Sequence, residues 1–591
     1  MSRPQETPEA YPRPLMRRQR WASLNGPWRF CFDNGMKCEV PGDVPQWPLT
    51  INVPFAPESA KSGIGDTGFH PSCWYEREFD APRDCERVIL HFGAVDYCAT
   101  VWVNDQLVAT HEGGHTPFSA DITPCLKPDG PQKLTVRADD DPEDMEKPRG
   151  KQDWRLEPHA IWYPRTTGIW QTVWLEPLPC THITGLSWTP HLERWEIGLQ
   201  VCVNDTMSHD LHVKVRLRHG ETVMAEDEYL VLRGQMHRRI VLSDPGIDDY
   251  RNDLMWSPAR PTLLDAEISL WRGDELLDEV RSYAAMRSVA VHRDRLLLNG
   301  RPYELRLVLD QGYWPESLMT APDDLAFKRD IELVKQMGFN GVRMHQKLED
   351  PRFHYWADVL GLAVVEEMPS TYRFSNKAVR RHMAEWTAAI LRDFSHPCIL
   401  LWVPFNESWG VPDLPSSPVH RDAVEAFYHL TKTLDPTRPV IGNDGWEASA
   451  TDILGIHDYS DVDALAQRYG PSAKLDDLFD RRRPGGRVLT LDGYPHRGQP
   501  IFLTEFGGIT YARPEERRKN RVWGYQMCDD IESFEQKCFN FLSTVHNSSV
   551  FSGFCYTQLT DTFQEANGLL YADRTPKIPL RKIAAAMRGP H

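Results

Sequence analysis

Apolar and polar residues alternate in short segments throughout residues 20–179. Clear examples are residues 87–95, 100–110 and 133–139, which Gly, Asn and Asp residues separate. A period of two is typical of β-strands with one buried face, and no long helical period interrupts it. The sequence Val-Asn-Asp-Gln at residues 103–106 predicts a hairpin turn. We therefore expect a β jelly roll or sandwich over residues 20–179.

A second series of alternating segments fills residues 180–286, spaced as in a seven-stranded sandwich. A length of about 100 residues is typical of an immunoglobulin-like β-sandwich. This region contains no grouping of acidic and basic side chains that would suggest catalysis, so we expect it to act as a spacer. Residues 1–19 are polar and proline-rich, and we expect them to form a flexible N-terminal arm.

From residue 287 the pattern changes to apolar strands that alternate with amphipathic helices. This alternation predicts parallel strands covered by helices, and eight such units predict a closed (β/α)8 TIM barrel over residues 287–591. The whole chain is thus expected to be a multidomain protein. The predicted barrel strands are residues 304–310, 339–345, 362–368, 399–407, 439–444, 453–459, 501–507 and 551–558.

Polar side chains follow all eight predicted barrel strands. Because the carboxyl ends of these strands meet at one mouth of the barrel, the side chains are expected to converge there. Stability does not require this arrangement, so we interpret the set as a functional site. Its members are Asp310, Gln311, Arg343, His345, Glu366, Glu367, Asn406, Glu407, Asn443, Asp444, His457, Asp458, Tyr459, Glu505, Tyr556 and Gln558.

Two carboxylates of this set lie on strands that face each other across the mouth. Glu407 ends the fourth strand, and Glu505 lies on the seventh. A retaining glycosidase needs such a pair, one acting as acid and base and the other as nucleophile, about 5–5.5 Å apart. Arg343 on the second strand is expected to keep a nucleophilic carboxylate ionised and oriented.

Several motifs, taken together and in order, resemble glycoside hydrolase family 2, which includes β-galactosidases, β-glucuronidases and β-mannosidases. The resemblance extends over nearly the whole chain. The segments similar to the sugar-binding jelly-roll domain of the family are residues 24–30, 95–123 and 165–176. The segments similar to its barrel motifs are residues 340–345, 396–408 and 503–507.

The resemblance implies roles for the matching residues. Glu407 corresponds to the acid/base and Glu505 to the nucleophile of the family. Asn406 corresponds to the residue that holds the 2-hydroxyl of the sugar, and Tyr459 to a tyrosine that contacts the nucleophile. The resemblance therefore implies retaining exo-hydrolysis of a terminal β-linked sugar from a small oligosaccharide or glycoside. A carbohydrate-binding protein without catalysis is the alternative from another class.

The sequence departs from the common family pattern at positions that select the sugar. Asp310 and Gln311 end the first strand, where basic residues or histidine are usual, and His345 or Gln346 takes the histidine position of the second. Residues 565–577 lack the Asn-x-Lys pair that clamps the sugar carboxylate in similar β-glucuronidases, and an acidic Asp310 would repel a carboxylate. We therefore expect a β-galactoside as substrate. A β-glucuronidase, a galacturonidase and an α-L-arabinosidase are the alternatives.

The remaining substrate contacts are expected from several parts of the chain. Asp139 lies in a first-domain loop, and similar loops of the family reach the barrel mouth. Trp523 is a candidate for stacking on a sugar face. The strand ends are expected to supply Asp310, Gln311, Arg343, His345, His457 and Gln558. Glu366 and Glu367 are expected to form hydrogen bonds, and we expect no metal and no cofactor.

Composition narrows the classes of partner. The net charge of −17 disfavours nucleic acids and anionic membranes as partners. The 12 cysteines show no spacing typical of zinc sites, and no apolar run is long enough to span a membrane. No signal peptide is visible, so we expect a cytoplasmic location unless a leader has been removed. Assembly into a homo-oligomer stays open.

Overall fold

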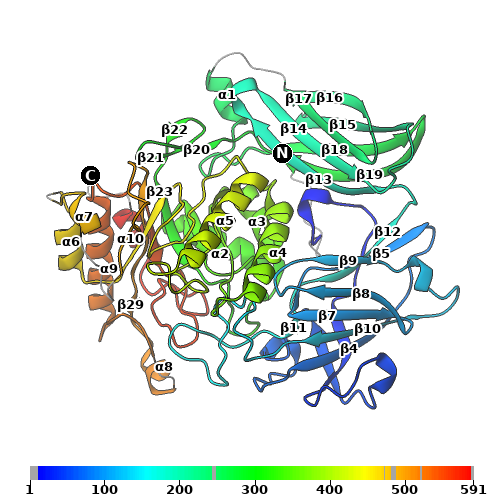
Figure 1. The fold of residues 1–591 in the computed structure, drawn as a ribbon, viewed down its shortest axis with the longest axis horizontal. Coiled ribbons are helices and arrows are strands. Elements are labelled where there is room, and N and C mark those ends of the chain that lie inside the picture. The colour runs from blue at the N-terminus through cyan, green and yellow to red at the C-terminus, as the bar shows by residue number, and fades with distance from the viewer. Residues whose placement is uncertain (1–10, 243–247, 472, 481–486, 520–521, 588–591) are drawn as a thin grey trace.

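Three bodies follow one another along the chain in the computed structural model, which describes residues 11–242, 248–471, 473–480, 487–519 and 522–587. Two β-sandwiches come first and a large barrel follows (Figure 1). Both sandwiches lie on the same side of the barrel in this view. The multidomain architecture expected from the sequence is confirmed.

The first domain is a β jelly roll, as the alternating pattern predicted. Its strands are β1 (Ala22–Ser23), β2 (Gly26–Phe32), β3 (Leu49–Val53), β4 (Ser72–Phe79), β5 (Arg87–Phe92), β6 (Val95–Asp96), β7 (Cys98–Val103), β8 (Gln106–Glu112), β9 (Phe118–Asp121), β10 (Gln132–Asp139), β11 (Gly168–Ile169) and β12 (Val173–Leu178). They form sheets ordered β3-β2-β4-β10-β7-β8 and β1-β12-β5-β9, with the pair β11-β6 beside them. Asn104 and Asp105 join β7 to β8 with φ of 51° and 66°, as a tight hairpin turn requires.

The second domain is a seven-stranded sandwich. Its strands are β13 (Ile183–His191), β14 (Glu196–Val203), β15 (Leu211–His219), β16 (Thr222–Leu230), β17 (Gln235–Val241), β18 (Leu264–Arg272) and β19 (Glu275–Ala284), with helix α1 (Asp248–Leu254) between β17 and β18. They form sheets ordered β13-β14-β17 and β16-β15-β18-β19. A small sheet, β20 (Val289–His292), β21 (Arg295–Leu298) and β22 (Arg301–Pro302), leads into the barrel.

The predicted flexible arm is corrected for residues 11–19. Tyr11 is buried, and Arg13 forms an ion pair with Glu176 of β12 at 2.8 Å. Arg18 forms another with Asp278 of β19, also at 2.8 Å. These contacts tie the segment to both sandwiches, because buried carboxylates need a positive partner. Residues 1–10 lie outside the described part of the chain.

Parallel strands and one irregular segment close the barrel. The strands are β23 (Leu305–Asp310), β24 (Gly341–Met344), β25 (Ala363–Glu367), β26 (Ile399–Val403), β27 (Leu454–Asp458), β28 (Ile501–Gly507) and β31 (Gly553–Thr557), ordered β26-β25-β24-β23-β31-β28-β27. The predicted fifth strand is instead a segment that pairs with the chain around β26 through isolated bridges, Trp402 with Val440 and Asn406 with Asp444. It still fills the gap between β26 and β27, so the polar strand ends meet as in a regular barrel.

Helices surround the barrel strands (Figure 1). They are α2 (Asp324–Gln336), α3 (Pro351–Leu360), α4 (Asn376–Asp393), α5 (Pro418–Leu434), α6 (Val462–Tyr469), α7 (Asp477–Asp480), α8 (Pro514–Lys519), α9 (Ile531–His546) and α10 (Leu580–Ala586), and the short strands β29 (Ile509–Thr510) and β30 (Gln526–Met527) precede α9. Helix α9 begins at Ile531, where the Asp530 side chain caps its first turn by accepting from Ser533 N. Within the described residues, no helix is long and apolar enough to cross a membrane.

Candidate active site

Glu407 lies just beyond β26, on the loop at the carboxyl-end mouth of the barrel. Its backbone has φ of 50°, and its N–H donates to Asp444 O at 2.9 Å. Its Oε1 lies 2.7 Å from His457 Nδ1, and its Oε2 accepts from Trp409 Nε1 at 3.3 Å. A left-handed backbone at a glutamate is sparsely populated, and such conformations cluster at functional sites.

Glu505 lies on β28 and is bound by two donors. Arg343 Nη1 donates to Oε1 at 2.6 Å, and Tyr459 OH donates to Oε2 at 2.5 Å. Burial alone would raise the pKa of Glu505, but His457 and Arg343 lower it to about 2. The carboxylate is therefore ionised at any pH at which the protein would work, which is the state that a nucleophile needs.

The two carboxylates approach each other across the mouth. One oxygen of Glu407, one oxygen of Glu505 and a ring nitrogen of His457 all lie within 4.8 Å of one another. Retaining glycosidases keep their two carboxyl groups about 5–5.5 Å apart, whereas inverting ones leave about 6.5–9.5 Å for a water molecule. This close approach of the two oxygens agrees with the shorter separation of the retaining class.

Arg343 on β24 joins four side chains below the mouth. Besides Glu505, it donates from Nη2 to Asn406 Oδ1 at 2.7 Å and from Nε to Glu367 Oε2 at 2.9 Å. Asp444 Oδ2 lies 3.2 Å from Nη2, and the Arg343 side chain is wholly buried. Burial would raise the pKa of Asp444, but Arg343 lowers it to about 2. The guanidinium thus fixes the relative positions of the carboxylates around it.

The His457 ring, which was expected to bind sugar, lies among three carboxylates. Its Nδ1 contacts Glu407, and its Nε2 lies 3.5 Å from Glu505 Oε1 and 3.7 Å from Asp444 Oδ2. A side chain at Gly445 would exclude this ring, because a Cβ there would lie 2.3 Å from the ring carbon Cγ. Although burial would lower the pKa of His457, Glu505, Asp444 and Glu407 raise it to about 10. The imidazole is therefore protonated at neutral pH, with both ring nitrogens facing carboxylates.

His345 is held in the opposite protonation state. Its Nδ1 lies 2.9 Å from Glu367 Oε1 and 4.0 Å from Glu505 Oε1. Burial and the neighbouring Arg343 hold the pKa of His345 well below its ordinary value. A neutral imidazole next to the ionised Glu505 has one donor and one acceptor nitrogen for hydrogen bonds.

An aromatic wall flanks Glu407 and includes first-domain residues that sequence reasoning did not single out. Trp162 Nε1 donates to Tyr372 OH at 2.8 Å, and the Trp162 and Trp409 rings lie 5.9 Å apart. Trp154 packs 4.7 Å from Trp162, and Trp446 lies 5.9 Å from Trp409. The only signal in the sequence was the density of aromatic residues between positions 154 and 163. Half-buried aromatic rings at a pocket rim suit contact with apolar faces of a ligand.

The two predicted residues at the end of the first strand both have partners within the protein. Asp310 accepts from Gly312 N at 2.9 Å, and burial together with Asp330 of α2 raises its pKa to about 6. Asp310 thus interacts with the loop after β23 and with α2. Gln311 donates from Nε2 to Gln558 Oε1 at 2.7 Å, and Gln558 in turn donates to Asn567 Oδ1 at 2.5 Å. Gln558 is fully buried with both ends of its amide engaged, so it supports Gln311.

Two further predicted contacts lie at the edge of the first domain and at the rim of the barrel. Asp139, at the end of β10, pairs with Arg137 at 2.7 Å and lines a hollow whose walls are all first-domain residues. It is therefore placed away from the two carboxylates. Trp523 lies 4.9 Å from the Tyr525 ring, which stacks on Tyr459 at 3.6 Å. Trp523 thus belongs to the rim, one aromatic ring removed from Tyr459.

The geometry can now be compared with known proteins. Residues 289–588 match the family described as glycosyl hydrolases family 2, TIM barrel domain, over more than half of the chain. The chain belongs to glycosyl hydrolase family 2. Residues 66–170 also match the galactose-binding domain-like part of glycosyl hydrolase 2 proteins, which agrees with the jelly roll.

Relatives within family 2 are distant. A β-galactosidase from Thermoanaerobacter pseudethanolicus is 28% identical over 379 residues, which cover 62% of this chain and 48% of the relative. The β-glucuronidase of Rattus norvegicus is 25% identical over 493 residues, which cover 74% of this chain and 71% of the relative. The chain spans about half the length of this β-galactosidase. It also spans about half the length of a putative β-glucuronidase from Formosa agariphila.

Solved structures of family 2 proteins share the whole fold. A Bifidobacterium dentium β-glucuronidase complexed with coumarin-3-O-glucuronide superposes with a TM-score of 0.76 at 20% identity, covering 96% of this chain and 97% of that one. A β-galacturonidase from Eisenbergiella tayi superposes with a TM-score of 0.72 at 20% identity, covering 97% of both chains. At this level of identity the likeness concerns the fold.

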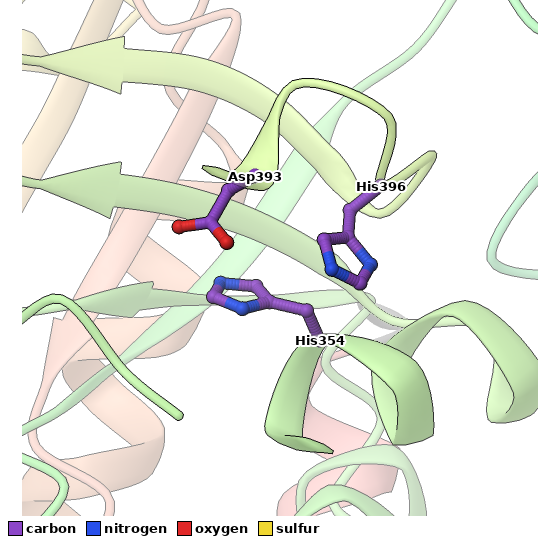
Figure 2. A group of neighbouring side chains, drawn as sticks. All are labelled: His354, Asp393 and His396. Atoms are coloured by element: carbon purple, nitrogen blue, oxygen red, sulfur yellow. The ribbon is translucent and has the colours of Figure 1, made fainter. Parts of the chain in front are cut away.

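A second group of titratable side chains lies behind the family 2 site. His354 of α3, Asp393 at the end of α4 and His396 point toward one another, and one ligand-type atom of each lies within 4.8 Å of the others (Figure 2). Their atom types would suit a small cation, but each also has a partner. These partners are Glu366 at 2.9 Å from His354 Nε2, Arg392 at 2.7 Å from Asp393 Oδ2 and Asp358 at 2.6 Å from His396 Nδ1. We read the group as an internal charge network, in which Glu366 has the hydrogen-bonding role expected of it.

Proposed function

We propose that this family 2 protein is a retaining exo-glycosidase that releases a terminal β-linked sugar from a small oligosaccharide or glycoside. The observation that carries the proposal is the approach of the Glu407 and Glu505 carboxylate oxygens to within 4.8 Å. Inverting hydrolysis needs a wider gap between the carboxyl groups. First-domain residues around Trp162 adjoin the mouth, and this favours a terminal sugar over the middle of a chain.

In the first half of the reaction Glu505 attacks the anomeric carbon. The bond from that carbon to the leaving oxygen breaks, and Glu407 gives its proton to the departing oxygen. Arg343 and Tyr459 hold both oxygens of Glu505 before attack, so the nucleophile needs no reorientation. Asn406 has its Oδ1 engaged by Arg343, and its Nδ2 supplies the donor for the 2-hydroxyl of the sugar.

In the second half water cleaves the glycosyl–Glu505 ester. Glu407, now ionised, takes a proton from the attacking water, and the new bond forms on the face that the leaving group occupied. His457 touches Glu407 through Nδ1 and lies beside Glu505, so its charge stabilises each carboxylate whenever that carboxylate is ionised. The product keeps the configuration of the substrate.

Within this function, β-galactosides and β-glucuronides are the two candidate classes of substrate. A β-galactoside was expected because residues 565–577 lack the Asn-x-Lys pair and because Asp310 is acidic. The second reason is weaker than the sequence suggested, since burial and Asp330 raise the pKa of Asp310 to about 6 and so disfavour its negative charge. The names of the relatives divide in the same way, between β-galactosidase and β-glucuronidase.

Two substitutions test the assignment of roles. Glu407→Gln should lower kcat on unactivated glycosides by about 100-fold or more, because general acid catalysis contributes about 10²–10⁴-fold. Glu505→Ala should abolish turnover, and added azide should restore part of it by taking the place of the nucleophile. Asp139→Asn is the matched control, because Asp139 lies in the first-domain hollow.

Aryl glycosides with a chromogenic leaving group provide the assay. The assignment fails if Glu407→Gln keeps wild-type activity on an unactivated substrate. A wild-type protein that binds such glycosides by calorimetry and releases no aryl alcohol would instead favour a non-catalytic carbohydrate-binding protein. Retention is read directly from the anomer that forms first, by proton NMR.

A further inference from the structure

A first-domain loop is fastened to the barrel mouth at Gly150. Arg149 N and Gly150 N both donate to Ser370 O, at 3.0 and 3.1 Å, and Tyr372 OH donates to Gly150 O at 2.8 Å. Gly150 has φ of +57°, and a Cβ at this position would lie 2.3 Å from Gln346 O. Only glycine allows so close an approach in this conformation. The loop is therefore built to bring the next residue to the mouth.

The next residue is Lys151, and its side chain is buried at the mouth. Lys151 is 5% exposed, and its Nζ lies 5.6 Å from the centre of the Tyr163 ring. On the barrel side its charge acts on two site residues. It adds to the effects of burial and Arg343 that lower the pKa of His345, and it partly offsets the burial that raises the pKa of Glu565.

Lys151 differs from the other buried lysines of the described chain in having no acidic group within ion-pair distance of its Nζ. Lys147 pairs with Asp140, Lys347 with Glu349, and Lys577 with Asp561 at 2.7 Å. No described residue offers Lys151 Nζ a hydrogen bond or an ion pair within 4.0 Å. A lysine side chain this deeply buried without a close acidic partner is unfavourable for the fold, so its position points to a ligand that supplies the missing negative charge.

From this contrast we infer that Lys151 binds a carboxylate on the terminal sugar, so that the substrate is a β-linked uronic acid. The inference rests on the proposed glycosidase function and names its substrate class. The barrel residues that the Lys151 charge acts on are His345, which is held neutral, and Glu565. The Oε2 atom of Glu565 already accepts from Tyr163 OH. Burial raises the pKa of Glu565, and Lys151 together with the hydrogen bond from Tyr163 offsets part of this rise. The cation that an Asn-x-Lys pair would supply, and that residues 565–577 lack, thus comes from the first domain.

Two pairs of substrates isolate the carboxylate. 4-Nitrophenyl β-glucuronide and β-glucoside differ only at C6, and so do the β-galacturonide and the β-galactoside. We expect one uronide to have a kcat/KM about 100-fold above its neutral partner, as a buried charged hydrogen-bonded pair implies. Turnover of the neutral glycosides without the uronides would overturn the inference and leave the glycosidase function standing.

A set of variants then assigns the effect to Lys151. Lys151→Met should lower kcat/KM on the preferred uronide about 100-fold and change it less than about threefold on the neutral partner. Lys151→Arg should restore part of the preference. Lys61→Met is the matched control, because Lys61 also reaches the barrel, donating to Pro322 O, but is exposed. An equal loss on both members of a pair would contradict the inference.

Equilibrium binding tests the same contact without catalysis. Titration calorimetry on the wild-type protein should detect glucuronate or galacturonate at concentrations where glucose and galactose give no heat. This measurement stands even if none of the four glycosides is hydrolysed, an outcome that would count against the proposed function. It also stands if Lys151→Met fails to fold. Absence of binding by either uronate would overturn the inference.

Discussion

His457→Gln removes a positive charge that contacts Glu407 and lies beside Glu505 and Asp444. The pKa of this imidazole is raised from 6.5 to about 10. At 1.36 kcal/mol per pKa unit, this corresponds to about 5 kcal/mol of net stabilisation of the charged imidazole, in which the surrounding carboxylates outweigh the opposing effect of burial. Glu407 is one of three such groups, so its share is about 1–2 kcal/mol, or about 10-fold in rate.

The direction of the pH effect follows from where the proton resides. Because the pKa of His457 is about 10, its imidazole holds a proton up to that pH, and Nδ1, 2.7 Å from Glu407 Oε1, can deliver this proton through Glu407 to the leaving oxygen. A carboxylic acid without such a partner ordinarily releases its proton below neutral pH. We therefore expect the alkaline limb of kcat/KM near pH 10 in the wild type and closer to neutral pH in His457→Gln. The titratable groups that face His457 are Glu407, Glu505 and Asp444, and His345 lies nearby.

Two leaving groups separate action through Glu407 from action on the sugar. A 2,4-dinitrophenyl glycoside departs without a proton, whereas an alkyl glycoside requires one. His457→Gln should lose about 10-fold more on the alkyl glycoside than on the dinitrophenyl one. His212→Gln in the second domain is the control. An unmoved alkaline limb, or equal losses on both substrates, would refute the reasoning and return His457 to a sugar-binding role.

Three further substitutions have defined outcomes. Arg343→Met leaves buried carboxylates unpaired, and calorimetry should show the barrel destabilised by about 3–5 kcal/mol. Tyr459→Phe removes a donor to Glu505 and should lower kcat about 10- to 100-fold with little change in KM, as steady-state assays would show. Gly150→Ala should lower thermal stability and weaken substrate binding together, because its Cβ would meet Gln346 O. Unchanged values would contradict each assignment.

The barrel was predictable because its hydrophobic period is strong. Segments such as residues 399–403 and 501–507 are continuously buried strands, and their apolar runs stand out between amphipathic helices. For the fifth strand, the sequence indicated where the segment lies but not that its pairing is irregular. Its residues 440–444 pair through isolated bridges, and such irregular pairing leaves no distinctive period.

Side-chain direction at the strand ends was the weaker part of the prediction. Adjacent strand residues point to opposite faces, so a pair such as Glu366 and Glu367 cannot both line the mouth. The structure directs Glu367 to Arg343 and Glu366 to His354 behind the barrel. That adjacent side chains alternate between the two faces could be stated from the sequence. Which residue of each pair points inward depends on how the strands are arranged in the closed barrel.

The contributions of the first domain could not be derived from sequence pattern, because they depend on contacts between segments far apart in the chain. Gly150 contacts a barrel residue about 200 positions away, and Tyr163 OH donates to Glu565. The barrel alone carries both carboxylates of the proposed reaction, but Lys151 and Trp162 reach its mouth only when the jelly roll is docked. Chemistry and sugar choice would therefore reside in different domains, and their relative placement would determine substrate specificity without altering the catalytic pair.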